Sequence, residues 1–310
     1  MGIEPDLTAQ LGPLKLRNPV VTASGTFGFG AEWEGIYDLS ALGAITVKAV
    51  TVRPRPGNPM PRTHETAAGM LNAIGLQNPG LEAFILEKLP YLRQFDVPVI
   101  VNIAADRLED FCTLTERLDS QPGVHAFEVN ISCPNQACGG IEFGVDPALT
   151  AQVISAVRAR TRLPLIAKLT PNVTDIRVIA RAAADAGADA LSLVNTYLGT
   201  AIDVRTRRFR IANRTAGLSG PCIKPLALCA VWRVAEAVDI PILGMGGIRT
   251  AEDALEFLLA GADAIAIGTA NFTDPRAAID VVAGIRSYMI ENDIPRIADL
   301  VGAVRPFGSA

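Results

Sequence analysis

The sequence predicts a (β/α)8 TIM barrel, an α/β fold in which eight parallel strands alternate with helices. Three observations lead to this prediction. Eight short apolar runs occur along the 310 residues, amphipathic stretches separate most of them, and Ala-Gly-Ala-Asp-Ala appears twice, at 186–190 and 260–264. Each copy leads into a short apolar run, as expected where a helix ends at glycine and a buried strand begins. We expect residues 1–310 to form one barrel domain.

Strands are predicted where nearly every residue is apolar, because both faces of a parallel barrel strand are buried. The predicted strands are 19–22, 44–47, 97–101, 126–129, 164–167, 190–194, 240–244 and 264–267. The predicted helices are 81–95, 108–118, 148–160, 175–186, 225–238, 251–260 and 275–290. A doubly wound sheet is the alternative, but its usual G-x-G-x-x-G after the first strand is absent.

Segments outside this alternation have their own predicted roles. Residues 7–11 and 14–17, separated by Gly12-Pro13, predict an N-terminal hairpin that closes the bottom of the barrel. Three connections, 49–79, 131–145 and 196–224, are too long for simple turns. Long ordered loops are usually lids or binding segments, so we expect them over the C-terminal mouth.

Polar residues and glycines follow the predicted strands. They are Ser24, Lys48, Asn102, Asn130, Lys168, Asn195, Gly246-Gly247 and Gly268-Thr269. In a barrel these positions converge on the C-terminal mouth, where barrel enzymes carry out their chemistry. Two of the chain's five lysines are in this set, and a lysine at a buried strand end is costly unless it meets an anion.

The glycines after the last two strands indicate a phosphate site. Gly244-Met-Gly-Gly-Ile248 and Gly268-Thr269 lie where barrels bind phosphate through backbone N–H groups. Ordinary tight turns would give the same residues. The two lysines at the mouth favour phosphate.

Cys133 is the candidate for proton transfer, since it begins a long loop at the mouth within Asn130-Ile-Ser-Cys-Pro-Asn135. An inert buried thiol is the alternative. A Cys–His nucleophilic pair is disfavoured because the chain has only His64 and His125, and His125 precedes the fourth strand at the opposite end of the barrel. Cys133 and Cys138 have no second cysteine pair, so no metal site is expected.

Composition narrows the choice of partners and compartment. The net charge is −4, and 49% of residues are apolar. This balance disfavours nucleic acid and anionic lipid as partners, and no run is long and apolar enough to span a membrane. Five cysteines without C-x-x-C spacing fit a reducing cytoplasm. The arginines from Arg205 to Arg214 indicate a solvated loop face, with a docking surface as the alternative.

Several motifs together resemble the class 1 dihydroorotate dehydrogenases. They are Ser24, Lys48, Asn72-Ala-Ile-Gly-Leu-Gln-Asn-Pro-Gly80, Asn130-Ile-Ser-Cys-Pro-Asn135, Lys168-Leu-Thr-Pro-Asn172, Leu218-Ser-Gly-Pro221 and Gly246-Gly247. The 72–80 motif resembles class 1B, whose catalytic subunit pairs with an electron-transfer subunit carrying FAD and a [2Fe–2S] cluster. The resemblance implies oxidation of (S)-dihydroorotate to orotate in pyrimidine biosynthesis, by one FMN-binding barrel.

The resemblance also implies the site residues. Cys133 is implied as the catalytic base and FMN as the hydride acceptor. Dihydroorotate is implied to bind Lys48, Asn72, Ala73, Ile74, Gly75, Leu76, Asn130, Asn135, Asn195 and Thr196. FMN is implied to bind Ser24, Lys48, Ala49, Asn102, Asn130, Lys168, Val194, Gly220, Gly246, Gly247, Gly268 and Thr269. Electrons are implied to reach NAD+ through the partner subunit, in a heterotetramer built on a barrel homodimer.

Three other functions stay open. One is a class 1A-like homodimer that reduces fumarate directly. Another is a Schiff-base lyase that uses Lys168 in a phosphate-binding barrel. The third is a flavin-binding module without catalysis.

Overall fold

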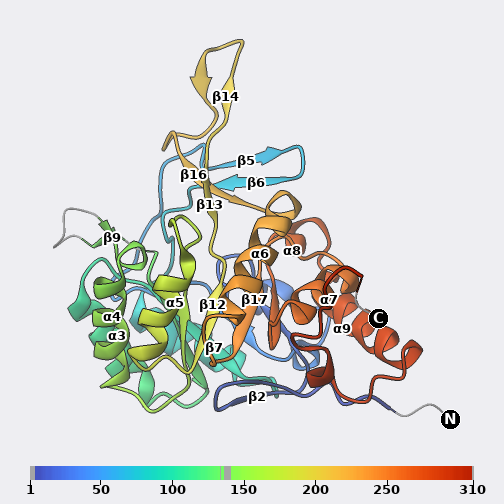
Figure 1. Ribbon diagram of the computed structural model, residues 1–310. Helices are drawn as coiled ribbons and strands as arrows, with labels where there is room; N and C mark the ends of the chain where they lie inside the picture. The colour runs from blue at the N-terminus through green and yellow to red at the C-terminus, as the bar shows by residue number, and fades with distance from the viewer. Residues whose placement is uncertain (1–3, 133, 136–140, 309–310) are drawn as a thin grey trace.

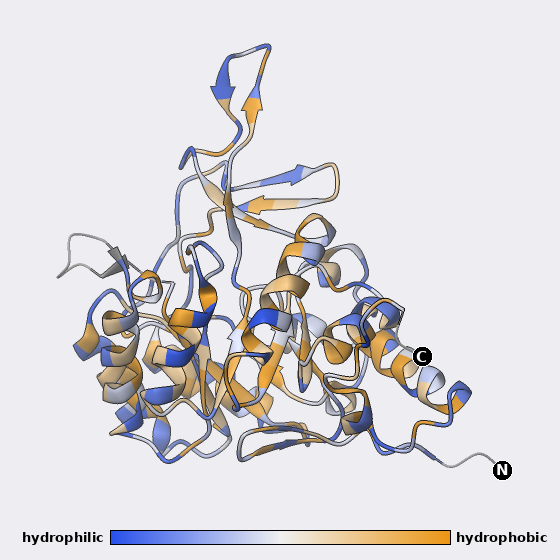
Figure 2. Cartoon of the chain, in the orientation of Figure 1, coloured by the Kyte–Doolittle hydropathy of each residue, from blue (hydrophilic) through white to orange (hydrophobic). Residues whose placement is uncertain are grey.

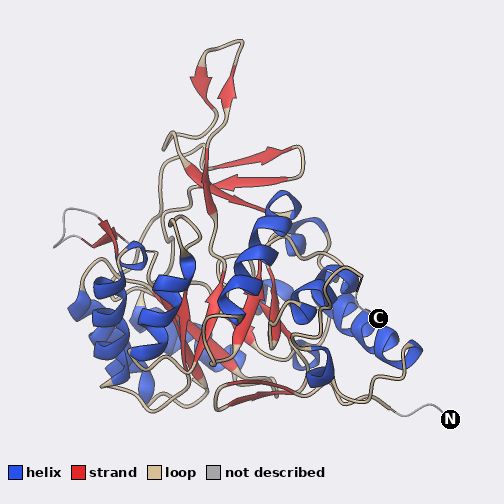
Figure 3. Ribbon diagram, viewed as in Figure 1, coloured by secondary structure: helices blue, strands red, loops and turns tan. Residues whose placement is uncertain are grey.

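The computed structural model describes residues 4–132, 134–135 and 141–308. At its centre eight parallel strands form a barrel, which confirms the predicted fold class (Figures 1 and 3). Going around the barrel, the eight strands follow one another in the order in which they occur along the chain. The ends of the sheet meet where Val21 pairs with Ala44 and the Gly43 N–H donates to the Val20 carbonyl at 2.8 Å. The barrel strands are β3 (Val20–Thr22), β4 (Ile45–Thr46), β7 (Val99–Ile103), β8 (Ala126–Asn130), β11 (Leu165–Lys168), β12 (Ala190–Leu193), β17 (Ile242–Met245) and β18 (Ala264–Ile267).

Helices surround these strands and bury their apolar faces against them (Figure 2). The longer helices are α3 (Leu108–Asp119), α4 (Pro147–Arg158), α5 (Ile176–Asp185), α6 (Lys224–Ala235), α7 (Ala251–Leu259) and α9 (Ala277–Glu291). The shorter helical segments are α1 (Leu81–Ala83), α2 (Leu89–Leu92), α8 (Ala270–Thr273), η1 (Ala31–Trp33), η2 (Leu39–Ala41), η3 (Phe84–Lys88), η5 (Phe143–Val145), η6 (Pro221–Ile223) and η7 (Ile297–Leu300). Every helix in the described part of the chain is too short or too polar to cross a membrane.

The predicted helix 81–95 differs from a regular α-helix. It divides into α1, the π-helical η3 and α2. Pro90 lies at the start of α2, and a proline has no N–H to donate and clashes with the carbonyl four residues earlier. A wider π turn before the proline is one way for a helix to accommodate it.

The repeated Ala-Gly-Ala-Asp-Ala has the same structural role in both copies. The Asp189 carboxylate accepts the Leu165 N–H at 2.8 Å, and the Asp263 carboxylate accepts the Ile242 N–H at 2.8 Å. Each aspartate therefore ties its own strand to the first residue of a neighbouring strand. The repeat marks the lower, N-terminal end of the barrel.

Segments outside the barrel lie at both of its ends. At the bottom, β1 (Ala9–Leu11) and β2 (Leu14–Leu16) form the predicted hairpin. At the top, β5 (Thr63–Thr66) and β6 (Gly69–Asn72) join β13 (Tyr197–Gly199) and β16 (Ala216–Ser219) in an antiparallel sheet of order β13-β16-β6-β5. The hairpin β14 (Ile202–Asp203) and β15 (Arg208–Phe209) extends above this sheet, and β9 (Pro134–Asn135) pairs with β10 (Ile141–Glu142) (Figure 1).

Candidate active site

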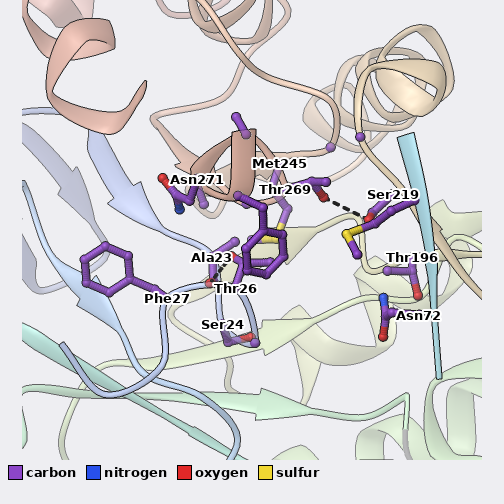
Figure 4. A pocket seen from close by; sticks show the side chains of 18 of the residues that line it. Ala23, Ser24, Thr26, Phe27, Asn72, Thr196, Ser219, Met245, Thr269 and Asn271 are labelled. Carbon is purple, nitrogen blue, oxygen red and sulfur yellow. Dashed lines mark hydrogen bonds between the residues drawn. The ribbon is translucent and has the colours of Figure 1, made fainter. Parts of the chain in front are cut away.

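A cavity of about 860 Å³ opens at the C-terminal mouth of the barrel. Its wall combines residues that follow the barrel strands with residues of the upper sheet, so the two long connections 49–79 and 196–224 cover it. Figure 4 shows Ser24 and Thr26 from the loop after β3, Asn72 from β6 and Thr269 after β18 around one space. Thr269 Oγ1 donates to Ser219 Oγ at 2.8 Å, which ties the last barrel strand to the upper sheet.

Most residues predicted to hold the substrate lie in this wall. Those lining the cavity are Lys48, Asn72, Ala73, Ile74, Gly75, Leu76, Asn130, Asn195 and Thr196. Asn195 Nδ2 donates to Ser132 Oγ at 3.0 Å and to Asn130 Oδ1 at 3.4 Å, so the two amides fix each other's orientation. The backbone of Asn135 lies in β9, but its side chain is outside the described residues. Cys133 is also outside them.

Most residues predicted to hold the cofactor line the same cavity. These are Ser24, Lys48, Ala49, Asn130, Lys168, Val194, Gly220, Gly246, Gly247, Gly268 and Thr269. Asn102 is the exception. It is fully buried and lies behind the wall, where its Nδ2 donates to Ser24 Oγ at 3.2 Å. Asn102 therefore reaches the cavity wall through Ser24.

Beneath Ser24, a buried polar network lies inside the barrel. Lys168 Nζ donates to Ser24 Oγ at 2.8 Å and forms an ion pair with Glu128 Oε2 at 3.5 Å. Glu128 also accepts from Asn102 Nδ2 at 2.5 Å and from Ser192 Oγ at 2.8 Å. The Oδ1 atom of Asn102 is buried with no hydrogen-bond partner in the part of the chain that the structure describes. A buried polar atom of this kind usually has a hydrogen-bond partner, so an N–H donor beside it would be stabilising.

Glu128 was not predicted from the sequence. The predicted site residues follow the strands, whereas Glu128 lies within β8, two residues before Asn130. Residues two apart on a strand share a face, so Glu128 faces the barrel interior as Asn130 does. A single carboxylate inside an otherwise apolar run was the signal that could have found it.

Lys48 is half-buried in the cavity wall beside a second cation. Burial and the positive charge of Arg62 lower the pKa of the Lys48 ammonium group, while Glu32 opposes that shift. Removal from water and a nearby like charge both disfavour the charged lysine. A bound anion would compensate for both effects, so this part of the wall is suited to a carboxylate.

The glycine turns at the rim bring backbone close to the cavity. Gly247 has φ +83°, and a Cβ there would lie 2.8 Å from the backbone nitrogen of Lys224 at the start of α6. Packing therefore requires glycine at this turn, as expected if these glycines form ordinary tight turns. The same turn also lines the cavity, so the packing requirement does not exclude contact with a phosphate.

Other candidate groups lie away from the cavity. Of the cysteines in the described ranges, Cys112, Cys222 and Cys229 are not among the lining residues. His125 precedes β8 at the lower end of the barrel, where its Nδ1 accepts the Val99 N–H at 3.0 Å. The arginines 205, 207, 208, 210 and 214 are exposed, on or next to the upper hairpin β14–β15. Among the described residues, no three His, Cys, Asp or Glu side chains gather as a metal site would require.

The chain is similar to known proteins over nearly its whole length. The model of the family "Dihydroorotate dehydrogenase" matches residues 6–289. The chain is 56% identical to "Dihydroorotate dehydrogenase B (NAD(+)), catalytic subunit" of Geotalea uraniireducens, over 97% of this chain and 99% of that protein. It is 57% identical to the protein of the same name from Desulforudis audaxviator, over 95% and 96% of the two chains. The counterpart from Geobacter sulfurreducens is 54% identical, over 97% and 99%.

Proposed function

The chain belongs to the dihydroorotate dehydrogenase family, and on that premise we propose that it is an oxidoreductase that converts (S)-dihydroorotate to orotate for pyrimidine biosynthesis. The observation that carries this proposal is the single cavity whose wall holds both Lys48 with the asparagine amides and Lys168 with the glycine turns. We further propose that its electrons pass to NAD+ through a partner subunit. The relatives named above are NAD(+)-linked catalytic subunits, which favours this reaction over the three alternatives.

The residues of the wall fit FMN. A volume of about 860 Å³ lies within the range of ~300–1,000 Å³ usual for small-molecule sites. The buried Asn102 Oδ1 needs an N–H donor, and the cation Lys168 lies beside Ser24. Gly246, Gly247, Gly268 and Thr269 would hold the phosphate through backbone N–H groups. Bound FMN supplies the acceptor for the substrate hydride.

A second set of residues in the cavity wall would hold and orient the substrate. The ammonium group of Lys48 would bind the substrate carboxylate. The amides of Asn72, Asn130 and Asn195 each offer a donor and an acceptor, which match the alternating N–H and C=O groups of the dihydropyrimidine ring. The contact between Asn130 and Asn195 limits their rotation, so the ring would meet preset partners.

Cys133 would remove the proton from C5 of dihydroorotate as the hydride leaves C6. This assignment comes from its position within Asn130-Ile-Ser-Cys-Pro-Asn135. In its thiolate form a cysteine side chain can accept a proton as a general base.

The partner is proposed to be a separate subunit that carries FAD and a [2Fe–2S] cluster, in a heterotetramer built on a barrel homodimer. The name "catalytic subunit" of the relatives implies a second kind of subunit in those proteins. The single FMN-binding barrel of this chain would then deliver electrons to that subunit. We propose a cytoplasmic location for the complex.

Expression of the chain alone tests the proposal. The purified protein should release FMN on denaturation and should reduce an artificial dye with dihydroorotate, but it should reduce NAD+ only when the FAD and iron–sulfur subunit is added. Efficient fumarate reduction would favour the class 1A alternative. Trapping of a substrate on Lys168 by borohydride would favour the lyase, and flavin without turnover would leave only a binding module.

A further inference from the structure

A carboxylate lies where the proposed cofactor site meets the barrel core. The side chain of Glu128 is 1% exposed and that of Lys168 is 5% exposed. Three side chains from three other strands converge on Glu128: Asn102 from β7, Lys168 from β11 and Ser192 from β12. Buried charges are costly unless they are paired and hydrogen-bonded. These three partners satisfy the hydrogen-bonding and charge requirements of the buried Glu128 carboxylate.

The partners of Glu128 are the groups that connect the core to the cavity. Lys168 lines the cavity and donates to Ser24 Oγ at 2.8 Å. Asn102 donates its Nδ2 to Glu128 and Ser24, which leaves Oδ1 as its acceptor. An ionised carboxylate can only accept hydrogen bonds, so Glu128 fixes which way the Asn102 amide faces. The same carboxylate places a negative charge beside the ammonium group of Lys168.

The electrostatic consequence has a definite sign. Positive charge near a flavin favours its reduced, more negative form, and negative charge opposes it. Inside a barrel the effective dielectric constant is low, so a charge one side chain away from the wall is weakly screened. Lys168 alone would stabilise the reduced flavin strongly, and Glu128 at 3.5 Å offsets part of that effect.

We infer that Glu128 is a positioning residue that holds Lys168 and Asn102 toward the cofactor and limits how strongly Lys168 favours the reduced flavin. The inference rests on the proposed function, because it needs flavin in this cavity. It assigns Glu128 no direct contact with the substrate. Its role is to set the reduction potential at which electrons leave the subunit.

The test is the midpoint potential of bound flavin in Glu128→Gln. The substitution keeps the shape of the side chain and removes its charge, so the ratio of reduced to oxidised flavin at a fixed potential should rise about tenfold, equivalent to about 30 mV for a two-electron couple. Glu128→Asp keeps the charge and should restore a potential close to that of the wild type. Asp263→Asn is the matched control. It removes a carboxylate from the lower end of the barrel and should leave the potential unchanged.

A second pair of variants covers the case in which Glu128→Gln fails to fold. Lys168→Gln should lower the potential, and adding Glu128→Gln to it should raise the potential again. Two results would overturn the inference if the wild-type protein binds flavin. One is a potential in Glu128→Gln equal to that of the wild type. The other is a potential in the double variant equal to that of Lys168→Gln. Absence of flavin from the wild-type protein would instead overturn the proposed function.

Discussion

Replacement of Lys48 by methionine removes the charge proposed to bind the substrate carboxylate and keeps most of the side chain's length. Two unit charges 4 Å apart attract by about 4 kcal/mol at the effective dielectric constant near a protein surface. Desolvation cancels part of this, and hydrogen bonds to charged groups contribute about 1.5–3 kcal/mol net. Since 1.4 kcal/mol is a factor of ten, orotate should bind about 10- to 150-fold more weakly.

The assay is an anaerobic titration of the flavin absorbance with orotate. Lys15→Met is the matched control, because it removes the same charge from the exposed face of β2 at the other end of the barrel. Its orotate dissociation constant should equal that of the wild type. The reasoning would be refuted if Lys48→Met and Lys15→Met bound orotate equally well.

The pH dependence of the same titration gives an independent check. Burial and Arg62 lower the pKa of Lys48 below its ordinary value of 10.5, and only the protonated lysine attracts a carboxylate. Orotate affinity should therefore begin to fall at a lower pH than an ordinary lysine would produce, and the fall should be absent from Lys48→Met. An identical pH profile in the variant would show that another group titrates.

Two further predictions follow from named positions. Cys133→Ala should retain FMN, and in rapid-mixing experiments its flavin should be reduced by dihydroorotate at least ~10²-fold more slowly than that of the wild type. Cys133→Ser should keep some activity, shifted to higher pH. Wild-type reduction rates in both variants would show that Cys133 is not the base. Gly247→Ala should lower the thermal unfolding midpoint, since left-handed backbone alone costs about 1–2 kcal/mol and the new Cβ would lie 2.8 Å from Lys224. Gly302→Ala, with φ +69° and no atom within 4 Å of its Cβ, should show only the backbone cost, so an equal effect in both would contradict the packing argument.

The barrel could be predicted from the sequence because its strands are buried on both faces. Burial makes strands such as 264–267 almost entirely apolar, and that pattern is local. The sequence also predicted that Lys48 and Lys168 lie at one cavity, because the carboxyl ends of barrel strands meet at one mouth. Family resemblance supplied the roles of these residues, which spacing alone left open.

The upper sheet could not be predicted in the same way. Its strands β6 and β16 have four residues each and pair across about 145 positions of sequence. Both are partly exposed, so neither shows a clear apolar run. Pairing between such strands is determined by tertiary contacts rather than by local pattern. The place of Asn102 behind Ser24 could not be predicted either, because it depends on a side-chain contact between segments that are far apart in the sequence.

A single-turnover experiment tests the central claim most directly. The purified chain is mixed anaerobically with excess dihydroorotate, without partner subunit or dye, and both flavin absorbance and orotate are measured over time. The flavin should bleach fully, and one orotate should form for each FMN, because one hydride is transferred per cofactor. Orotate formation without flavin bleaching, or flavin that dihydroorotate leaves oxidised, would contradict the account.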